Sequence, residues 1–175
     1  LGDVPGTWRD ELRTARDLTA RVRTFYPTPE GLTQIAAHLR AASERLRDTP
    51  IDTLVALFDR LAERWLALDA PHRVDAIPAI VAATGFSPEM VAEALDLEQE
   101  SSRAPHLMRA LRQELGDPAV LDGLVPNPHL MGRTRAVGPE LVGAVFSANI
   151  PGLPHLEVMR AFLVKAACLG KVPSG

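Results

Sequence analysis

The feature that most constrains the fold lies near the C-terminus, where residues 141–146 read Leu-Val-Gly-Ala-Val-Phe. A short, almost purely apolar run of this kind is typical of a strand buried on both faces of a parallel sheet. A loop over residues 147–152 follows, then an amphipathic helix of about 155–167 and a second strand-like stretch at 168–172. Strand, loop, helix and strand in this order predict a parallel βαβ unit and therefore an α/β fold class.

A single βαβ unit cannot bury both faces of a parallel sheet, and the sequence stops where the second strand of this unit ends. We therefore expect the chain to be truncated, the front part of a larger protein. Residues 126–175 would hold a linking strand and the start of the α/β domain, and residues 1–125 would form a helical N-terminal region.

The helical prediction for residues 1–125 rests on recurrent helix start signals. Thr28-Pro29, Thr49-Pro50, Ser87-Pro88 and Asp117-Pro118 each place a capping oxygen before a proline. Proline suits the first helical position because its missing N–H has no partner there in any case. We expect helices over about 8–25, 30–47, 51–68, 71–83, 88–98 and 103–115.

The stretch between the two parts is rich in proline and glycine, which leaves room only for short extended pieces. Thr134 and Val137 favour a strand over about 130–137, and Gly138-Pro139 predicts a turn after it. This strand should lie apart from the parallel sheet.

Composition excludes several classes of protein. Hydrophobic residues make up 46% and charged residues 23% of the 175 positions, as in ordinary globular domains. A net charge of −3 gives no reason to expect a nucleic-acid partner. No uncharged run reaches the roughly 20 apolar residues of a spanning helix, and the first residues lack a signal-peptide core. With a single cysteine, these features favour a cytoplasmic protein without disulfides.

Two residue types need separate comment. Only Lys165 and Lys171 are lysines among the 19 basic residues, a bias typical of GC-rich bacterial genes, so neither is a default surface residue. The five histidines are well separated in sequence and have no recurring ligand partner, so we expect no metal site.

The segment Phe146-Ser-Ala-Asn-Ile-Pro-Gly-Leu-Pro, followed by Leu163-Val-Lys-Ala-Ala-Cys-Leu-Gly-Lys-Val-Pro-Ser-Gly, carries a family resemblance. It resembles the first cofactor-binding βαβ of the aldehyde dehydrogenase superfamily, in particular its long-chain acyl-CoA reductase (LuxC-type) branch. That branch has a Gly-Asn-Val-Pro-Gly loop, where this chain has Ala148 and Ile150 at the glycine and valine positions. Residues 84–91, 111–124 and 138–142 also resemble that branch, so the resemblance covers about residues 50–175.

The resemblance implies specific site residues. Asn149 matches the asparagine that stabilises the oxyanion formed on the thioester carbonyl, and Lys171 matches the lysine that binds the adenosine ribose of the cofactor. Phe146, Ser147 and Ser174 are assigned to cofactor binding on the same ground. From the residues alone, Asn149 could equally be a turn residue and Lys171 an exposed cation at a strand end.

Cys168 is expected to be structural, because it lies between a helix end and a strand, far in sequence from the family's nucleophile. The chain also lacks the Gly-x-Gly-x-x-Gly fingerprint of common dinucleotide-binding proteins, as aldehyde dehydrogenases do. The nucleophile would then lie outside this chain.

The expected function is reduction of a fatty acyl thioester to an aldehyde with NADP as the cofactor, through a cysteine acyl-enzyme. The implied partners are an acyl-CoA or acyl-carrier thioester and, in the full-length enzyme, further copies of the same subunit. An aldehyde dehydrogenase acting on another substrate and a non-catalytic helical interaction module remain alternatives.

Overall fold

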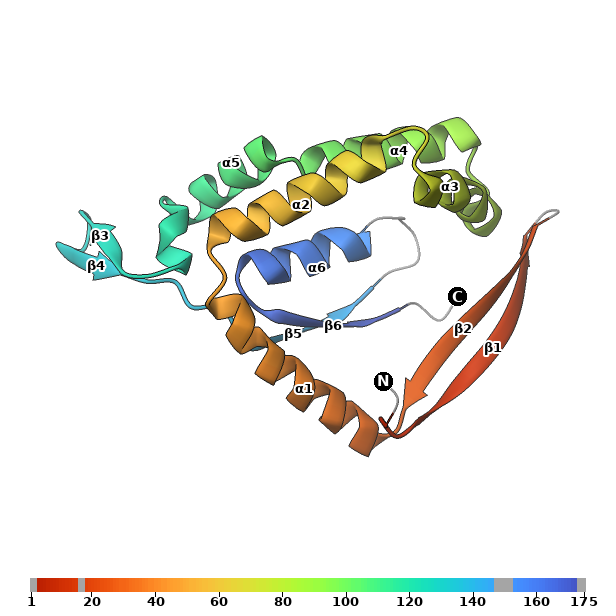
Figure 1. Cartoon of the computed structure of the whole chain (residues 1–175), viewed down its shortest axis with the longest axis horizontal. Coiled ribbons are helices and arrows are strands. Elements are labelled where there is room, and N and C mark those ends of the chain that lie inside the picture. The colour runs from red at the N-terminus through yellow and green to blue at the C-terminus, as the bar shows by residue number, and fades with distance from the viewer. Residues whose placement is uncertain (1–2, 16–17, 147–152, 173–175) are drawn as a thin grey trace.

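The computed structural model of the chain describes residues 3–15, 18–146 and 153–172 (Figure 1). In chain order its elements are β1 (Gly6–Ala15), β2 (Leu18–Pro27), α1 (Pro29–Arg47), α2 (Ile51–Leu66), α3 (Pro71–Thr84), α4 (Pro88–Ser101), α5 (Ala104–Leu115), the 3₁₀ turn η1 (Pro118–Leu121), β3 (Val125–Asn127), β4 (Gly132–Thr134), β5 (Leu141–Val145), α6 (Leu153–Leu163) and β6 (Ala167–Lys171).

The predicted parallel βαβ unit is confirmed. Strands β5 and β6 pair in parallel, with Leu141 opposite Ala167 and Val145 opposite Lys171. Helix α6 is the crossover between them and packs against β6. The α/β fold class follows from this unit, although helices dominate the chain.

Strand β5 is more exposed than its apolar sequence predicts. Gly143 and Val145 face solvent, and the Val145 side chain is 80% exposed. Among the described residues β6 is the only strand paired with β5, so part of the apolar surface of β5 has no covering neighbour.

Five of the six helices predicted over residues 1–125 are present at nearly the predicted positions, and two of them, α1 and α4, begin with the predicted side-chain cap. The Thr28 and Ser87 hydroxyls accept hydrogen bonds from the N–H groups of Gly31 and Met90, at 3.1 and 3.2 Å. Thr49 does not cap its helix. Helix α2 begins at Ile51, and the carboxylate of Asp122 accepts from the Ile51 N–H.

The helix predicted over 8–25 is wrong, since these residues form the antiparallel hairpin of β1 and β2. Trp8 lies opposite Phe25 with ring centroids 5.0 Å apart, and the Arg23 guanidinium lies 4.8 Å from the Trp8 ring centroid. Aromatic and charged cross-strand pairs of this kind stabilise a hairpin, whereas in a helix these partners would lie too far apart to meet. The hairpin contacts α1 and α3.

The strand predicted over 130–137 is shorter than expected and covers only Gly132–Thr134. It pairs with β3 in a separate two-stranded sheet, apart from β5 and β6, as predicted. In Figure 1 this small hairpin projects from the body of the molecule.

One hydrophobic core joins the helical region to α6. Figure 1 shows α6 between α2 and the β5–β6 pair. The core draws its buried side chains from α2, α5, η1 and α6, and Phe58 of α2 meets Phe162 of α6 with ring centroids 6.2 Å apart. On the strand side, α1 packs against β6 and β5. The βαβ unit is therefore held by helices that precede it in sequence.

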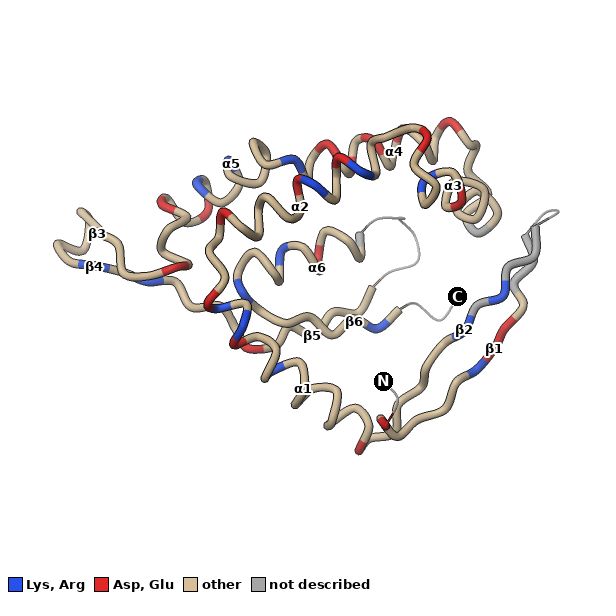
Figure 2. The backbone as a smooth tube through the Cα atoms, in the orientation of Figure 1, with Lys and Arg blue, Asp and Glu red and all other residues tan. Residues whose placement is uncertain are grey.

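Acidic and basic residues both occur along α2 and α5, α4 carries acidic residues and no basic one, and β5 has no charged residue (Figure 2). In the part of the chain that the structure describes, no helix combines the length and the apolar character needed to cross a membrane.

Candidate functional site

The candidate site lies at the carboxyl ends of β5 and β6. In open α/β sheets, ligands bind at this edge of the parallel strands. Phe146 follows β5, and its backbone N–H donates to the carbonyl of Lys171, the last residue of β6, at 3.0 Å. Phe146 and Lys171, which are both predicted to bind the cofactor and are 25 positions apart in sequence, thus lie side by side.

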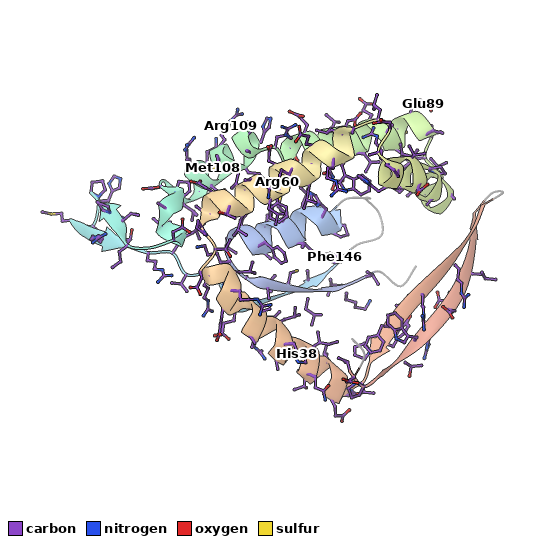
Figure 3. The ribbon with its side chains drawn as sticks, in the orientation of Figure 1. His38, Arg60, Glu89, Met108, Arg109 and Phe146 are labelled. Atoms are coloured by element: carbon purple, nitrogen blue, oxygen red, sulfur yellow. The ribbon has the colours of Figure 1, made fainter. Side chains whose placement is uncertain are left out.

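The Phe146 side chain packs against β6 at Gly170. A Cβ on Gly170 would collide with the Phe146 ring, which lies 3.3 Å from the Cβ position at Cδ2 and still closer at Cε2 and Cζ. Glycine at this position therefore lets the half-buried ring cover the strand immediately before Lys171. Figure 3 shows Phe146 at the end of the strand, beside the β5–β6 pair.

Lys171 is exposed at the same edge, and its Nζ makes one long hydrogen bond of 3.4 Å, to the carbonyl of Val172. An ammonium held this loosely can turn toward a hydroxyl or a phosphate without losing a strong partner.

Three predicted site residues, Ser147, Asn149 and Ser174, lie outside the described residues. Asn149 belongs to residues 147–152, which join Phe146 to the first turn of α6. The positions of β5 and α6 therefore fix both ends of the segment that carries Asn149.

The first turn of α6 is anchored by a hydrogen bond that sequence analysis missed. His155 Nε2 lies 3.2 Å from the hydroxyl of Ser102, which is fully buried at the end of α4. The hydroxyl donates to the Glu98 carbonyl, so we assign the Nε2 proton to the imidazole, which donates to Ser102. Burial lowers the pKa of His155, which favours the neutral ring.

Helix α6 ends at Leu163, earlier than predicted, and Lys165 lies in the turn that follows it. Lys165 has a φ of 61°, in the left-handed region. Its N–H donates to the Phe162 carbonyl and the Ala166 N–H donates to the Ala161 carbonyl, the pair of bonds that defines a Schellman motif. The turn that this motif makes brings the chain directly into β6.

Lys165 is 5% exposed, and its ammonium has two partners. Nζ donates to Asp122 Oδ1 at 2.5 Å and to the Arg47 carbonyl at 3.1 Å. The same Asp122 carboxylate accepts from the first N–H of α2, at 3.0 and 3.2 Å from its two oxygens. Because lysine is rare in this chain, the sequence singles out Lys165 as well as Lys171 as a residue with a specific role.

Cys168 lies in the amino-terminal half of β6, opposite Val142, and not at the carboxyl edge. Burial, with a smaller effect from the Glu157 carboxylate, raises the pKa of its thiol. A thiol that resists ionisation is a poor nucleophile, which agrees with a structural role. Among the described residues no group of three histidine, cysteine, aspartate or glutamate side chains could hold a metal ion.

Comparison with known proteins identifies the family of the chain. Searches of curated proteins and of solved structures gave no significant match. One family model, described as Acyl-CoA reductase (LuxC), matches residues 46–175, which include α2 to α6 and both strands of the parallel pair. The chain therefore belongs to the LuxC acyl-CoA reductase family.

Proposed function

We propose that the chain is the front portion of an NADPH-dependent acyl-CoA reductase that converts a fatty acyl thioester to an aldehyde through a cysteine acyl-enzyme. The observation that carries the proposal is the parallel β5–α6–β6 unit, which brings Phe146 and Lys171 together at its carboxyl edge in a chain of this family.

The described residues fit a nicotinamide cofactor in chemical character. Lys171 offers an exposed ammonium for a ribose hydroxyl or a phosphate, and Phe146 offers an aromatic surface beside it. Ser147 and Ser174 would add hydroxyl donors from the two segments that leave the same edge. The bound cofactor would supply the hydride for the reduction.

Asn149 would act on the acyl group. Attack of a thiolate on the thioester carbonyl places negative charge on the carbonyl oxygen, and an amide N–H from Asn149 would stabilise that charge. Where one such donor has been removed from an enzyme, the rate has fallen by about 10²–10³. The anchors at both ends of α6 would keep the segment bearing Asn149 in place.

The attacking thiolate would come from outside this chain, because the environment of Cys168 disfavours ionisation. The 175-residue chain alone is then expected to show no reductase activity. Since one core joins both parts, we propose the division into residues 1–125 and 126–175 as a functional boundary, in which the second part holds the cofactor and the first supports it.

The test is an assay of the full-length gene product with a fatty acyl-CoA and NADPH, following aldehyde formation. We expect Asn149→Ala to lower kcat by about 10²–10³ with little change in KM. Lys171→Ala should raise the KM for the cofactor, whereas Cys168→Ala should leave turnover unchanged. Oxidation of aldehydes without thioester reduction would favour an aldehyde dehydrogenase of another class, and no turnover at all would favour an interaction module.

Cofactor preference gives a second test. A hydroxyl at Ser174 can donate to a 2′-phosphate, and Lys171 would supply positive charge nearby. Ser174→Glu adds a carboxylate that repels the phosphate. We expect the wild-type protein to have the higher kcat/KM with NADPH and the variant to shift the ratio toward NADH. An unchanged ratio would remove Ser174 from the cofactor site.

A further inference from the structure

Helices α4 and α5 form one outer side of the molecule. Each contacts α2 more extensively than it contacts the other, so the two helices follow one another along α2. Figure 1 shows them on the far side of α2 from the β5–β6 pair. A turn of two residues, Ser102 and Arg103, joins them. Their outward faces are therefore two halves of one surface, which we call the α4–α5 surface.

The α4 half of this surface combines acidic and apolar side chains. Leu97 is 68% exposed and Met90 is 55% exposed. Seven residues, about two helical turns, separate them, so both lie on the same face of the helix. The helix has no basic residue, and its acidic residues are Glu89, Glu93, Asp96, Glu98 and Glu100. The α4 half thus presents exposed apolar side chains among carboxylates.

The α5 half has the opposite charge. A shallow, open hollow lies on it, and none of the described residues that line the hollow is acidic. The hollow has an apolar floor and a polar rim, formed respectively by Ala104, Pro105 and Met108 and by Arg109, Arg112 and Gln113. Figure 3 shows Met108 and Arg109 on α5 and Glu89 on α4. The two halves therefore match each other, with a projecting leucine among acids on one and an apolar hollow among bases on the other.

Some of the charges on this surface lack a partner within the chain. Asp96 is already paired with Arg73. Among the described residues, by contrast, neither Glu93 of α4 nor Arg112 of α5 forms an ion pair or a side-chain hydrogen bond, and both are exposed. A docking partner that offers a base to α4 and an acid to α5 would satisfy both halves at once.

A second copy of the same chain is such a partner. A twofold axis that lies across both helices at the turn between them places α4 of each copy antiparallel to α5 of the other. Residues equally far from the turn then meet, because both helices rise by about 1.5 Å per residue. Glu93 and Arg112 each lie nine residues from the near end of the turn, and Leu97 and Met108 each lie five residues from it. Leu97 thus meets the hollow around Met108, and Glu93 meets Arg112.

The alternative twofold arrangement is opposed by charge. An axis parallel to the helices would place α4 on α4, so that the carboxylates of the two copies would face each other without a base between them. Like charges placed together across an interface disfavour association. Charge therefore selects the arrangement in which α4 lies on α5.

We propose that the α4–α5 surface is an interface between two copies of this chain, in which Leu97 of each copy packs into the hollow around Met108 of the other and Glu93 pairs with Arg112. The inference does not depend on the proposed function, because it uses none of the residues assigned to the cofactor or to the acyl group.

Sedimentation equilibrium of the full-length gene product over a range of concentrations tests the proposal. We expect Glu93→Arg and Arg112→Glu each to shift the wild-type assembly toward one of half its mass. Twofold symmetry applies each change twice, so a tenfold loss at each contact raises the dissociation constant about a hundredfold. The double variant restores opposite charges at both contacts and should recover the wild-type mass. Glu44→Arg, the same charge change on an exposed position of α1, is the matched control and should leave the mass unchanged.

Leu97→Ala tests the apolar contact without altering charge. Because Leu97 is exposed within one copy, the variant should keep the stability of the subunit and raise the dissociation constant about tenfold or more. It also gives a result if circular dichroism shows that a charge-reversed variant is unfolded.

Three results would overturn the proposal. The first is a wild-type protein that stays monomeric at all concentrations, and the second is a mass that neither the charge reversals nor Leu97→Ala change. The third is dissociation of both single charge variants without recovery in the double variant, which would show that Glu93 and Arg112 contact a different protein and not each other.

Discussion

Lys165 donates to Asp122 across 2.5 Å, although 43 residues separate them in sequence. The pair ties the turn between α6 and β6 to the residue that follows η1, and through the Ile51 N–H to the start of α2. The Arg47 carbonyl, at the end of α1, completes the set around the ammonium. One buried charge therefore joins the parallel unit to the helices that support it.

Removing Asp122 should destabilise the protein through two effects. Asp122→Ala leaves the Lys165 ammonium without its carboxylate and α2 without its cap. Removing one partner of a buried ion pair lowers the free energy of unfolding by about 3–5 kcal/mol. Because the Asp122 side chain is 37% exposed, we expect a loss at the lower end of that range. Asp122→Asn keeps an oxygen for the Ile51 N–H and should cost about 1 kcal/mol less than alanine. Urea unfolding of both variants checks this, and equal losses would contradict the capping role.

The backbone at Lys165 allows a separate measurement on the same pair. Lys165→Met removes the charge but keeps a side chain at a φ of 61°, whereas Lys165→Gly removes both the charge and the left-handed strain. Glycine should therefore be the more stable of the two variants by about 1 kcal/mol. If methionine is the more stable, packing of the lysine stem outweighs the strain.

Gly170 should control the Phe146 ring. Gly170→Ala places a methyl group where the ring now lies, so the ring must move away from β6. We expect the Kd for NADPH, measured by its fluorescence in the full-length gene product, to rise about tenfold, which corresponds to about 1.4 kcal/mol. Gly143→Ala in β5 is the matched control, because its added Cβ meets nothing within 4 Å. Equal affinities in the two variants would show that the Phe146 ring makes no contact with the cofactor.

The burial of His155 makes stability depend on pH with a defined sign. Because burial lowers the pKa of His155, the unfolded chain binds its proton more readily than the folded one. The stabilisation is full above the ordinary histidine pKa of about 6.5 and is lost as the pH falls through the lowered value. His155→Gln keeps an N–H for Ser102 but cannot titrate, so thermal unfolding from pH 7 to pH 4, a range set by the ordinary pKa of about 6.5, should show a smaller decline than in the wild type. Parallel declines would assign the titration to other groups.

Ser102→Ala tests the Ser102–His155 hydrogen bond itself at neutral pH. It leaves the imidazole N–H facing a methyl group, and an unsatisfied buried donor costs about 1–3 kcal/mol. The expected readout is a loss of that size in urea unfolding. A change near zero would mean that water replaces the hydroxyl.

The features that sequence predicts well here are local or follow from topology. Helices such as α1 and α4 begin where a capping hydroxyl precedes proline, a signal complete within four residues. The proximity of Phe146 and Lys171 follows from parallel pairing alone, because the ends of adjacent parallel strands must meet. By contrast, Asp122–Lys165 and Ser102–His155 join residues 43 and 53 positions apart, and no local pattern indicates which partner each will find.

The hairpin of β1 and β2 is a second case in which contacts between distant residues, and not local sequence, determine the structure. Its strands contain leucine, alanine, arginine and glutamate, which favour helices, so local propensity predicts a helix. The strand conformation is favoured by the cross-strand register, which places Trp8 opposite Phe25 and Asp10 opposite Arg23. These contacts exist only once the two halves meet.

Charge pairing across this hairpin leads to the last prediction. Asp10 Oδ2 lies 2.8 Å from the Arg21 guanidinium and Oδ1 lies 3.8 Å from that of Arg23. Asp10→Lys would place three positive charges together on one face, and like charges across strands destabilise pairing by roughly 0.2–1 kcal/mol. We expect faster amide hydrogen exchange in β1 and β2 but not in α2, with the difference shrinking in high salt. Glu93→Lys, the same charge change on an exposed position of α4, is the control, and faster exchange in the hairpin of that variant too would attribute the effect to net charge and not to the cross-strand pairs.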